Sequence, residues 1–515
     1  MISTTKMCWL ILVEVVYGSE RFVLPTVRGD LVGYSSMSFP DVVTFTGVPY
    51  AVQPEGELRF RHTTVLESFP KPVLGSQPSL GFACPQANQT YGPDGEVYSQ
   101  HEGCLFFQFA LPRSFFTHNQ SIAYALVTIH GGDFILGSSA DRHHDYRRPT
   151  ALDGVASFSM NYRLGVLGFL SDDPMHYNAG FRDQQLALEV ISDVSRGLGV
   201  IRTLLAGQSA GAASVAAHLL VTPSGYDGVL MQSNPSGIRL VTPGEARLNW
   251  NTLFSSCGRS CDLSTLLSVQ KKLVLSKERS IFGGHGDIIG LLPIGLVSDG
   301  LLLTSNLVKQ YSGGSGRHDI PVMVGSTANE TVFGVFKIAP MAVSPLLYPV
   351  ISTALVGRGL GPVLRNRYPV LPSDLGDVRR PVTRLSTDWT FACGAHGYTQ
   401  GNASACNIYY FMYSNVASCS LWGKNCVGTS CHSDDLLLFY NSSTLDCRIT
   451  AAEMKVGTEW RRRAFGMLDG VAPWPSACDS FGDGTEISKT VQVGRVSCSF
   501  NRTEHSCDFW EELVL

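Results

Sequence analysis

Charged residues are scarce in this sequence. Only 16% of the 515 residues are Asp, Glu, Lys or Arg, whereas 44% are hydrophobic, and the formal net charge is -4. This composition excludes a disordered or coiled-coil protein and predicts a globular one with a large buried core. No run of Lys or Arg stands out, so nothing indicates a nucleic-acid partner. We expect the chain to act on a small, neutral molecule.

Long apolar runs are also lacking beyond the N-terminus. No later stretch approaches the roughly 18 apolar residues of a membrane helix, so no transmembrane segment is expected. The first residues differ, because Lys6 precedes an apolar run over 7–17 that Gly18 and Ser19 follow. This pattern predicts a secretion signal over residues 1–18, with a buried strand as the alternative. Residues 511–515 are not a retention signal, so the predicted location is extracellular.

Cysteine patterns typical of metal sites are missing. The 14 cysteines are scattered and do not form Cys-x-x-Cys pairs accompanied by histidines, so disulfides are expected and a metal site is not. If Cys8 leaves with the signal, 13 cysteines remain, and at least one is free or pairs between chains. Five glycosylation sequons agree with an oxidising, secretory compartment, at Asn88, Asn119, Asn402, Asn441 and Asn501.

Short runs rich in Val, Ile and Leu alternate with helical patterns. This alternation is typical of βα units in a mostly parallel sheet, whose buried strands are continuously apolar. The clearest predicted strands are 125–129, 201–206, 320–324 and 408–413, and helical spacing covers 186–191 and 210–220. The sequence contains no internal repeat, low-complexity tract or long linker. We therefore expect residues 19–515 to form a single α/β domain.

A candidate nucleophile lies between a predicted strand and a predicted helix. Residues 207–211 read Gly-Gln-Ser-Ala-Gly, with the strand 201–206 before them and the helix 210–220 overlapping their end. The Gly-x-Ser-x-Gly pattern alone is common by chance. In this context, however, a strained turn lifts the serine hydroxyl off the sheet, and the glycines leave room for the close crossing of strand and helix. Ser209 is the predicted nucleophile.

A glycine-rich segment upstream is the predicted oxyanion loop. Residues 130–134 read His-Gly-Gly-Asp-Phe and follow the predicted strand 125–129. Backbone N–H groups in such a loop can meet the negative charge that develops on a carbonyl oxygen, and each is worth about 3 to 4 kcal/mol of the barrier. A plain glycine turn after a strand is the alternative interpretation.

A serine hydroxyl needs a base to take its proton and an acid to orient that base. Of the 13 histidines, His432 is the most promising, because it follows a predicted strand and precedes a helical run. Glu330 comes shortly after strand 320–324, at the edge where α/β sheets place their ligands. Taken alone, either residue could be an ordinary surface side chain. The sequon at Asn329 overlaps Glu330 and is expected to stay unglycosylated.

Further motifs resemble the type-B carboxylesterases and cholinesterases. They follow the order of that family over nearly the whole chain after residue 18, at residues 45–51 (Phe-Thr-Gly-Val-Pro-Tyr-Ala), 56–60 (Gly-Glu-Leu-Arg-Phe), 102–105 (Glu-Gly-Cys-Leu), 161–165 (Asn-Tyr-Arg-Leu-Gly), 183–184 (Asp-Gln), 207–211, 385–388 (Leu-Ser-Thr-Asp) and 507–510 (Cys-Asp-Phe-Trp). The resemblance implies the α/β-hydrolase fold, with a large, mostly parallel central sheet flanked by helices. It also implies a serine ester hydrolase that needs no metal or organic cofactor.

The resemblance assigns roles to particular residues. It implies a triad of Ser209, Glu330 and His432, with oxyanion donors on the backbone N–H groups of Gly132, Asp133 and Ala210. It implies disulfides that pair Cys84 with Cys104, Cys257 with Cys261, and Cys393 with Cys507. Arg59 and Glu102 resemble a structural ion pair at the base of the loop between Cys84 and Cys104.

The sequence departs from the family pattern in three ways near the expected site. Asp133 stands where the family usually has glycine or alanine, and its carboxylate must point away from the oxyanion. Gln208 replaces the glutamate that many members carry before the serine, and no tryptophan lies between Cys84 and Cys104. Cholinesterases use that charge and an indole toward cationic substrates, so choline esters are not the expected substrate.

The expected function is therefore a secreted carboxylic-ester hydrolase that acts on a small-molecule ester through an acyl-enzyme. One alternative is a catalytically weak or inactive relative that serves as an adhesion or scaffold protein, since the fold has members that lost the triad. A second alternative is a lipase, in which the loop between Cys84 and Cys104 is a lid over an apolar pocket.

Overall fold

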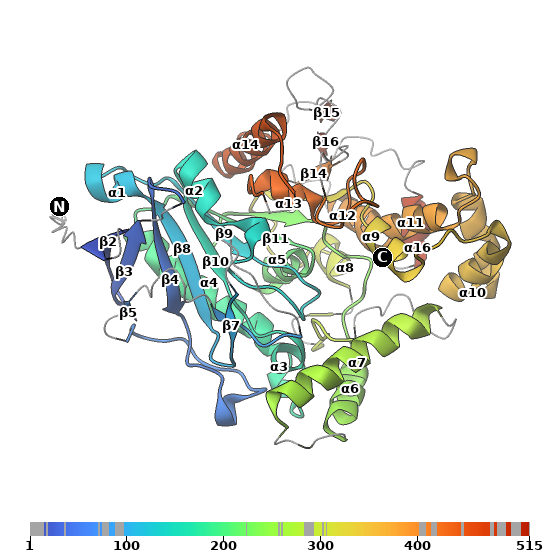
Figure 1. Cartoon of the computed structure of the whole chain (residues 1–515), viewed down its shortest axis with the longest axis horizontal. Helices are drawn as coiled ribbons and strands as arrows, with labels where there is room; N and C mark the ends of the chain where they lie inside the picture. Colours follow the sequence, from blue (N-terminus) through green and yellow to red (C-terminus); the bar gives the residue numbers. More distant parts are fainter. Residues whose placement is uncertain are drawn as a thin grey trace.

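The computed structural model describes most of the chain (Figure 1). The residues outside this description are 1–14, 17–18, 36–37, 71–72, 75–81, 88–96, 223, 256–257, 259–260, 283–292, 301–302, 305, 401–407, 414–419, 444–446, 474–477, 481–490, 496–505 and 514–515. The expected secretion signal lies among them except for β1 (Val15–Val16), which pairs with the strand that follows it. The signal and the single domain over residues 19–515 stay predictions.

A parallel core occupies the centre of the molecule. Among the described residues, fourteen strands form one sheet, and its six central strands run parallel to one another. Their spatial order is β10 (Ala156–Met160), β9 (Tyr124–Ile129), β11 (Arg202–Gln208), β12 (Gly228–Gln232), β13 (Val322–Thr327) and β14 (Ile408–Tyr413). Every residue of β10, β12 and β13 is buried, as expected for strands covered on both faces. The four predicted strands are confirmed as β9, β11, β13 and β14, although β11 and β13 begin and end later than predicted.

The two ends of the sheet are antiparallel, which the prediction of a mostly parallel sheet did not include. Beyond β10 come β8 (Phe106–Pro112), β4 (Val42–Pro49), β3 (Gly29–Ser35), β2 (Ser19–Thr26) and β1, and beyond β14 come β16 (Val491–Arg495) and β15 (Cys478–Ser480). The fourteenth strand, β5 (Val73–Leu74), lies beside this order and pairs in parallel with β3. Antiparallel neighbours need only a short turn, such as residues 27–28 between β2 and β3, whereas parallel ones need a long crossover. The sheet is therefore mixed, and the parallel arrangement holds for its centre.

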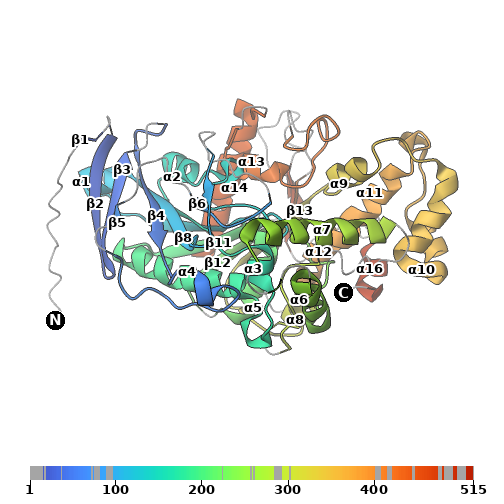
Figure 2. The same cartoon turned by 60° about the horizontal axis from the view of Figure 1, so that its bottom comes forward.

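Helices cover both faces of the sheet (Figures 1 and 2). On one face, α4 (Ala179–Gly197) and α5 (Ala210–Val221) pack with Val127 and Leu205 in one hydrophobic core. On the other face, α13 (Asp434–Phe439) and α14 (Ala451–Gly466) pack with Leu126 and Leu204 in a second core. Successive side chains of a strand point to opposite faces, so an unbroken apolar strand supplies both cores. The two predicted helices are confirmed as α4, which is longer than predicted, and α5.

Further helices and strands complete the described structure. They are α1 (Arg113–His118), α2 (Arg147–Asp153), α3 (Gly165–Phe169), α6 (Pro243–Ser255), α7 (Leu263–Phe282), α8 (Leu307–Ser312), α9 (Val332–Ile338), α10 (Tyr348–Arg367), α11 (Arg379–Thr387), α12 (Cys393–Gln400), α16 (Cys507–Leu513), β5 (Val73–Leu74), β6 (Phe82–Ala83) and β7 (Ser99–Gln100). In Figure 1, α10, α11 and α16 lie at the opposite end of the molecule from β2 and β3. No single helix in the described ranges is long and apolar enough to cross a membrane, and one bent pair, 345–356 with 359–367, passes that test only when taken together.

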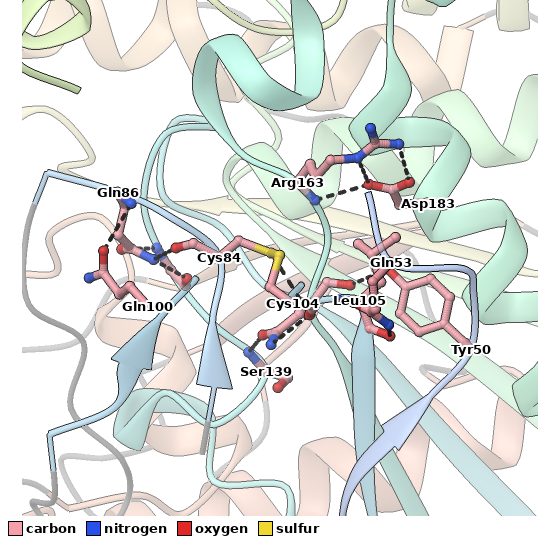
Figure 3. Close-up of a disulfide and its surroundings, with 12 residues drawn as sticks. Tyr50, Gln53, Cys84, Gln86, Gln100, Cys104, Leu105, Ser139, Arg163 and Asp183 are labelled. Carbon is pink, nitrogen blue, oxygen red and sulfur yellow. Dashed lines mark hydrogen bonds and ion pairs between the residues drawn. A yellow bond between two sulfur atoms is a disulfide. The ribbon is translucent and has the colours of Figure 1, made fainter. Parts of the chain in front are cut away.

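Three disulfides are resolved between described cysteines. Cys84 is bonded to Cys104 (Figure 3), Cys393 to Cys507, and Cys426 to Cys431. The first two pairs are the ones that the family resemblance implied, whereas the third was not foreseen. Cys261 is disulfide-bonded, but its expected partner, Cys257, lies outside the described residues. Closing the 114-residue separation of Cys393 and Cys507 stabilises the fold by roughly 4 to 5 kcal/mol through chain entropy.

Candidate active site

Ser209 lies in a tight turn at the junction of β11 and α5. Its φ of 57° and ψ of -124° are strained for a residue with a side chain, as in a nucleophile elbow. The turn closes only because glycine flanks it: a Cβ on Gly207 would lie 2.3 Å from the carbonyl oxygen of Gly211, and a Cβ on Gly211 would lie 2.1 Å from that of Ile129. The N–H of Ser209 donates to the carbonyl of Gln232 on the neighbouring strand at 2.9 Å.

The glycine-rich loop after β9 packs directly against this turn. A Cβ on Gly131 would lie 2.6 Å from the backbone oxygen of Gln208 and 3.2 Å from the Cβ of Ser209, so no larger residue fits there. Gly132 has φ of 105° and Asp133 has φ of 54°, a left-handed stretch that turns the backbone sharply. The predicted oxyanion loop and the predicted nucleophile are therefore in contact.

Three backbone donors near the turn are available to a ligand. The N–H groups of Gly132, Asp133 and Ala210 donate no hydrogen bond to any described residue. Ala210 is the first residue of α5, where helix geometry leaves the N–H groups without an internal partner and favours negative charge. Free donors of this kind are what a developing oxyanion requires.

The segment after Cys84 is hydrogen-bonded to the backbone just beyond the oxyanion loop (Figure 3). Gln86, two residues after Cys84, donates from its amide to the carbonyl of Gly137 at 2.8 Å and accepts from the N–H of Gly137 at 3.0 Å. Its own N–H donates to Gln100. The sequence contained no signal for these two hydrogen bonds, because a single buried glutamine has no characteristic sequence pattern. The expected Arg59–Glu102 ion pair is present nearby, with Nε to Oε2 at 2.6 Å.

The carboxylate of Glu330 holds the imidazole of His432. Glu330 is fully buried, and its Oε2 lies 2.6 Å from Nδ1 of His432. Its Oε1 accepts the N–H of Thr327 at 2.7 Å, which fixes the carboxylate to the end of β13. The backbones also meet, because the N–H of His432 donates to the carbonyl of Glu330 at 3.2 Å. Two residues 102 positions apart are thus joined at two points.

The loop that carries His432 is held by side chains. The Cys426–Cys431 disulfide closes it immediately before His432, and the N–H of Cys431 donates to Asp434 at 2.8 Å. The indole of Trp422 donates to the carbonyl of His432, and Phe333 stacks between Trp422 and the imidazole, with ring centroids 4.1 and 5.8 Å away. A cysteine next to His432 was a visible signal in the sequence, but its partner was not.

The charges around His432 favour its protonated form. Burial is the largest single influence and acts to lower the pKa of His432, but the charge and hydrogen bond of Glu330, together with the charges of Asp133 and Asp435, outweigh it. The net effect is a pKa raised above the ordinary value. A base that readily accepts a proton is suited to general-base catalysis near neutral pH.

Two further buried carboxyls lie close to the imidazole and were not singled out from the sequence. Burial raises the pKa of Asp434 and of Asp435 to about 7. Asp434 accepts hydrogen bonds from Ser420 and the loop backbone. Oδ2 of Asp435 accepts from Gln232 at 2.9 Å, whereas its Oδ1 has no hydrogen-bond partner in the described part of the chain. Within the described ranges, no group of three or more acidic, histidine or cysteine side chains is arranged to hold a metal ion.

One contact differs from an assembled triad. The amide nitrogen of Gln208 lies 3.1 Å from Nε2 of His432, which is the nitrogen that would take the proton of Ser209. Among the described residues, the hydroxyl of Ser209 makes no hydrogen bond. Contacts of Gly131, Gln208 and Glu330 thus link the predicted oxyanion loop, the turn of Ser209 and the loop of His432, but the imidazole is bonded to Gln208.

Comparisons with known proteins agree with this architecture. The model of the carboxylesterase family matches residues 21–462. The crystal protein of Dictyostelium discoideum is 28% identical over 425 residues, which cover 79% of this chain and 75% of that protein. Mouse cholinesterase is 29% identical over 331 residues, which cover 59% of this chain and 53% of that protein.

Solved structures give the same fold. The structure of a PNB esterase superposes with a TM-score of 0.73 and 20% identity, covering 94% of this chain and 99% of that one. At this identity the likeness shows the α/β-hydrolase fold alone, whereas the family match extends through the sequence from β2 to α14. The chain belongs to the carboxylesterase family.

Proposed function

We propose that this protein is a secreted carboxylic-ester hydrolase in which Ser209 is the nucleophile, His432 the general base and Glu330 the acid that orients it. The observation that carries the proposal is the 2.6 Å bond from Glu330 to Nδ1 of His432, at the same end of the sheet as the strained turn of Ser209. This bond places the proton of the neutral imidazole on Nδ1 and leaves the Nε2 lone pair to act as the base.

The reaction follows from these positions. Ser209 Oγ attacks the ester carbonyl carbon while its proton passes to Nε2 of His432, and the free N–H groups of Gly132, Asp133 and Ala210 receive the oxyanion. His432 then returns the proton to the leaving alcohol, which departs as the acyl-enzyme forms. A water molecule, deprotonated by the same imidazole, releases the acid and restores Ser209.

A scaffold protein is the second candidate, and two observations favour it. The hydroxyl of Ser209 makes no hydrogen bond to His432 in the resting structure, and one relative of similar length carries the name of a crystal protein and not of an enzyme. Against it, all three triad residues are present, and the Glu330–His432 pair is buried at the cost of desolvating both groups. Such a costly pair is typical of a functional site.

Covalent labelling separates the two candidates. A fluorophosphonate probe should label the wild type and leave Ser209→Ala unlabelled, with Ser214→Ala as the matched control, because Ser214 lies one turn later in α5 and is bonded to Gln184. Labelling of Ser209→Ala, or a folded wild type that does not label, would refute the hydrolase assignment. Thermal unfolding of each protein shows that it is folded.

The substrate class and location are tested separately. A panel of nitrophenyl esters from acetate to palmitate, assayed below and above their solubility limits, distinguishes a soluble-ester hydrolase from a lipase, which gains activity at an interface. Mass analysis of the protein recovered from the culture medium of secreting cells should find a mature chain that begins near Ser19. A chain retained in the cells with residues 1–18 intact would contradict the proposed secretion.

A further inference from the structure

Gln208 is hydrogen-bonded to Nε2 of His432, the nitrogen that would accept the proton of Ser209. It is the last residue of β11, next to Ser209, and only 6% of its surface is exposed. Its amide nitrogen is 3.1 Å from Nε2 of His432. The backbone of Gly131 closes the other side of the glutamine, because a Cβ on Gly131 would lie 3.1 Å from its Oε1.

The direction of this hydrogen bond follows from which ring nitrogen of His432 carries a proton. Glu330 is an acceptor and lies 2.6 Å from Nδ1, so Nδ1 carries the proton of the neutral imidazole and Nε2 offers only a lone pair. In the neutral imidazole, which is the form that can act as a base, the amide N–H of Gln208 therefore donates to that lone pair. The same lone pair must accept the proton of Ser209, and the hydroxyl of Ser209 is without a hydrogen bond among the described residues.

We infer that Gln208 is a positioning residue that holds His432 in the resting enzyme, and that the imidazole serves Ser209 only after the glutamine bond is released. The inference rests on the proposed hydrolase function. Gln208 thereby competes with the hydroxyl of Ser209 for Nε2 of His432. Substrate entering beside Gly131 and Gln208 is the event that can shift the amide, since both residues contact the turn of Ser209.

The charges around His432 explain why an amide, and not a carboxylate, is suited to position 208. Carboxyl groups act on His432 from three elements: Glu330 after β13, Asp133 in the oxyanion loop and Asp435 in α13. Lys337 in α9 acts on Asp133. A further carboxylate beside Nε2 would bind the imidazolium and keep the base protonated, whereas an amide engages the neutral imidazole and adds no charge.

Removing the amide is the first test. A neutral hydrogen bond broken before reaction slows that reaction by about two- to tenfold, so Gln208→Met should be labelled by a fluorophosphonate faster by that factor. The matched control is Gln184→Met, because Gln184 is also a buried glutamine bonded to a histidine, at 3.1 Å, but this histidine is His218 and not His432. The control should label at the wild-type rate.

Adding a charge is the second test. Gln208→Glu should move the acid limb of the kcat/KM profile to higher pH by about one unit or more, because the new carboxylate stabilises the imidazolium. Thermal unfolding confirms that each variant is folded. A wild-type midpoint in Gln208→Glu would overturn the inference, because the side chain at position 208 would then not face the base.

A spectroscopic measurement is independent of turnover. In protein with 15N-labelled histidine rings, the Nε2 resonance of His432, assigned with His432→Gln, should shift in Gln208→Met and stay in place in Gln184→Met. An unchanged resonance, or labelling of Gln208→Met at or below the wild-type rate, would overturn the inference. If the wild type does not label at all, the proposed hydrolase function fails, while the Nε2 resonance still decides whether Gln208 holds the imidazole.

Discussion

The turn of Ser209 and the loop of His432 reach the same site by different physical means. The turn is held by the backbone: glycines at 207 and 211 permit a crossing that no Cβ could enter. The loop is held by side chains, namely the Cys426–Cys431 disulfide, the Trp422 indole and the carboxylates of Glu330 and Asp434. A turn that depends on its backbone has a short, recognisable sequence pattern, whereas a set of side-chain contacts from distant segments has none.

The comparison also explains where the site can adjust. Steric exclusion leaves the turn of Ser209 one conformation, and the residues around it are almost fully buried. The imidazole depends on a few hydrogen bonds, each of which exchanges more easily than a packed backbone. We therefore expect changes in the turn to affect folding, and changes around His432 to affect the rate and its pH dependence.

The largest effect is expected from Glu330→Gln, which alters one of the side chains that hold the loop of His432. The amide can present a donor to Nδ1 and favour the wrong tautomer, so kcat should fall by about 10³- to 10⁴-fold with little change in stability. The matched control is Glu245→Gln, which also breaks a close charge pair, with Arg239 at 2.7 Å, but far along the chain in α6. Steady-state kinetics on a nitrophenyl ester measure the loss. A decrease of less than tenfold would mean that Glu330 does not orient the base.

Gly211→Ala tests whether the backbone of the Ser209 turn excludes any side chain. Its new methyl group would lie 2.1 Å from the carbonyl oxygen of Ile129, so β9 and α5 must separate, and the free energy of unfolding should fall by about 3 kcal/mol or more. Gly244→Ala is the control, since nothing lies within 4 Å of its added Cβ. Denaturant unfolding compares the two. Equal stability of both variants would show that the crossing at Ser209 is not sterically closed.

Removal of the Cys426–Cys431 disulfide is expected to have an intermediate effect. For a separation of five residues, the loss of chain entropy is worth about 2 kcal/mol of stability, and the loosened loop should lower kcat more than it changes KM. The double variant Cys426→Ser with Cys431→Ser is compared with the wild type in thermal unfolding and steady-state assays. Unchanged kcat would show that Glu330 and Trp422 position His432 without the disulfide.

The smallest effect is expected from Asp435→Asn, and it depends on pH. Burial raises the pKa of Asp435 to about 7 from an ordinary 3.8, so between these values the native state keeps a proton that the unfolded state releases. The wild type should therefore lose stability relative to the variant as pH rises through this range. Losing the charge should also lower the pKa of His432 and shift the acid limb of kcat/KM down by about half a unit.

Parallel pH series of unfolding and kinetics check both parts of this prediction. Asp434→Asn is a useful companion, because Asp434 has a similarly raised pKa but is not among the main causes of the raised pKa of His432. It should share the stability effect and not the kinetic one. A pH-independent difference in stability between the wild type and Asp435→Asn would mean that Asp435 stays in one protonation state.

Much of the fold could be predicted from the sequence, because its signals are local. Continuous apolar runs predicted β9, β11, β13 and β14, and the glycine pattern around Ser209 predicted the turn before α5. The antiparallel strands at the ends of the sheet were missed, since polar residues, glycine or proline interrupt their apolar runs, as in β4 and β8. For the site, His432 and Glu330 were selected by their places after strands, but their 2.6 Å bond depends on two loops meeting in space.

By itself, the sequence determined the parallel centre of the sheet, the strained turn and the class of chemistry, because apolar periodicity and glycine spacing act within a few residues. Only the tertiary structure decided which nitrogen of His432 faces Gln208, that Cys426 pairs with Cys431, and that Gln86 clamps Gly137. Each of these is a contact of a few ångströms between loops whose course depends on the packing of the whole sheet. Hydrogen bonds and disulfides require that accuracy of placement, whereas burial of an apolar strand does not.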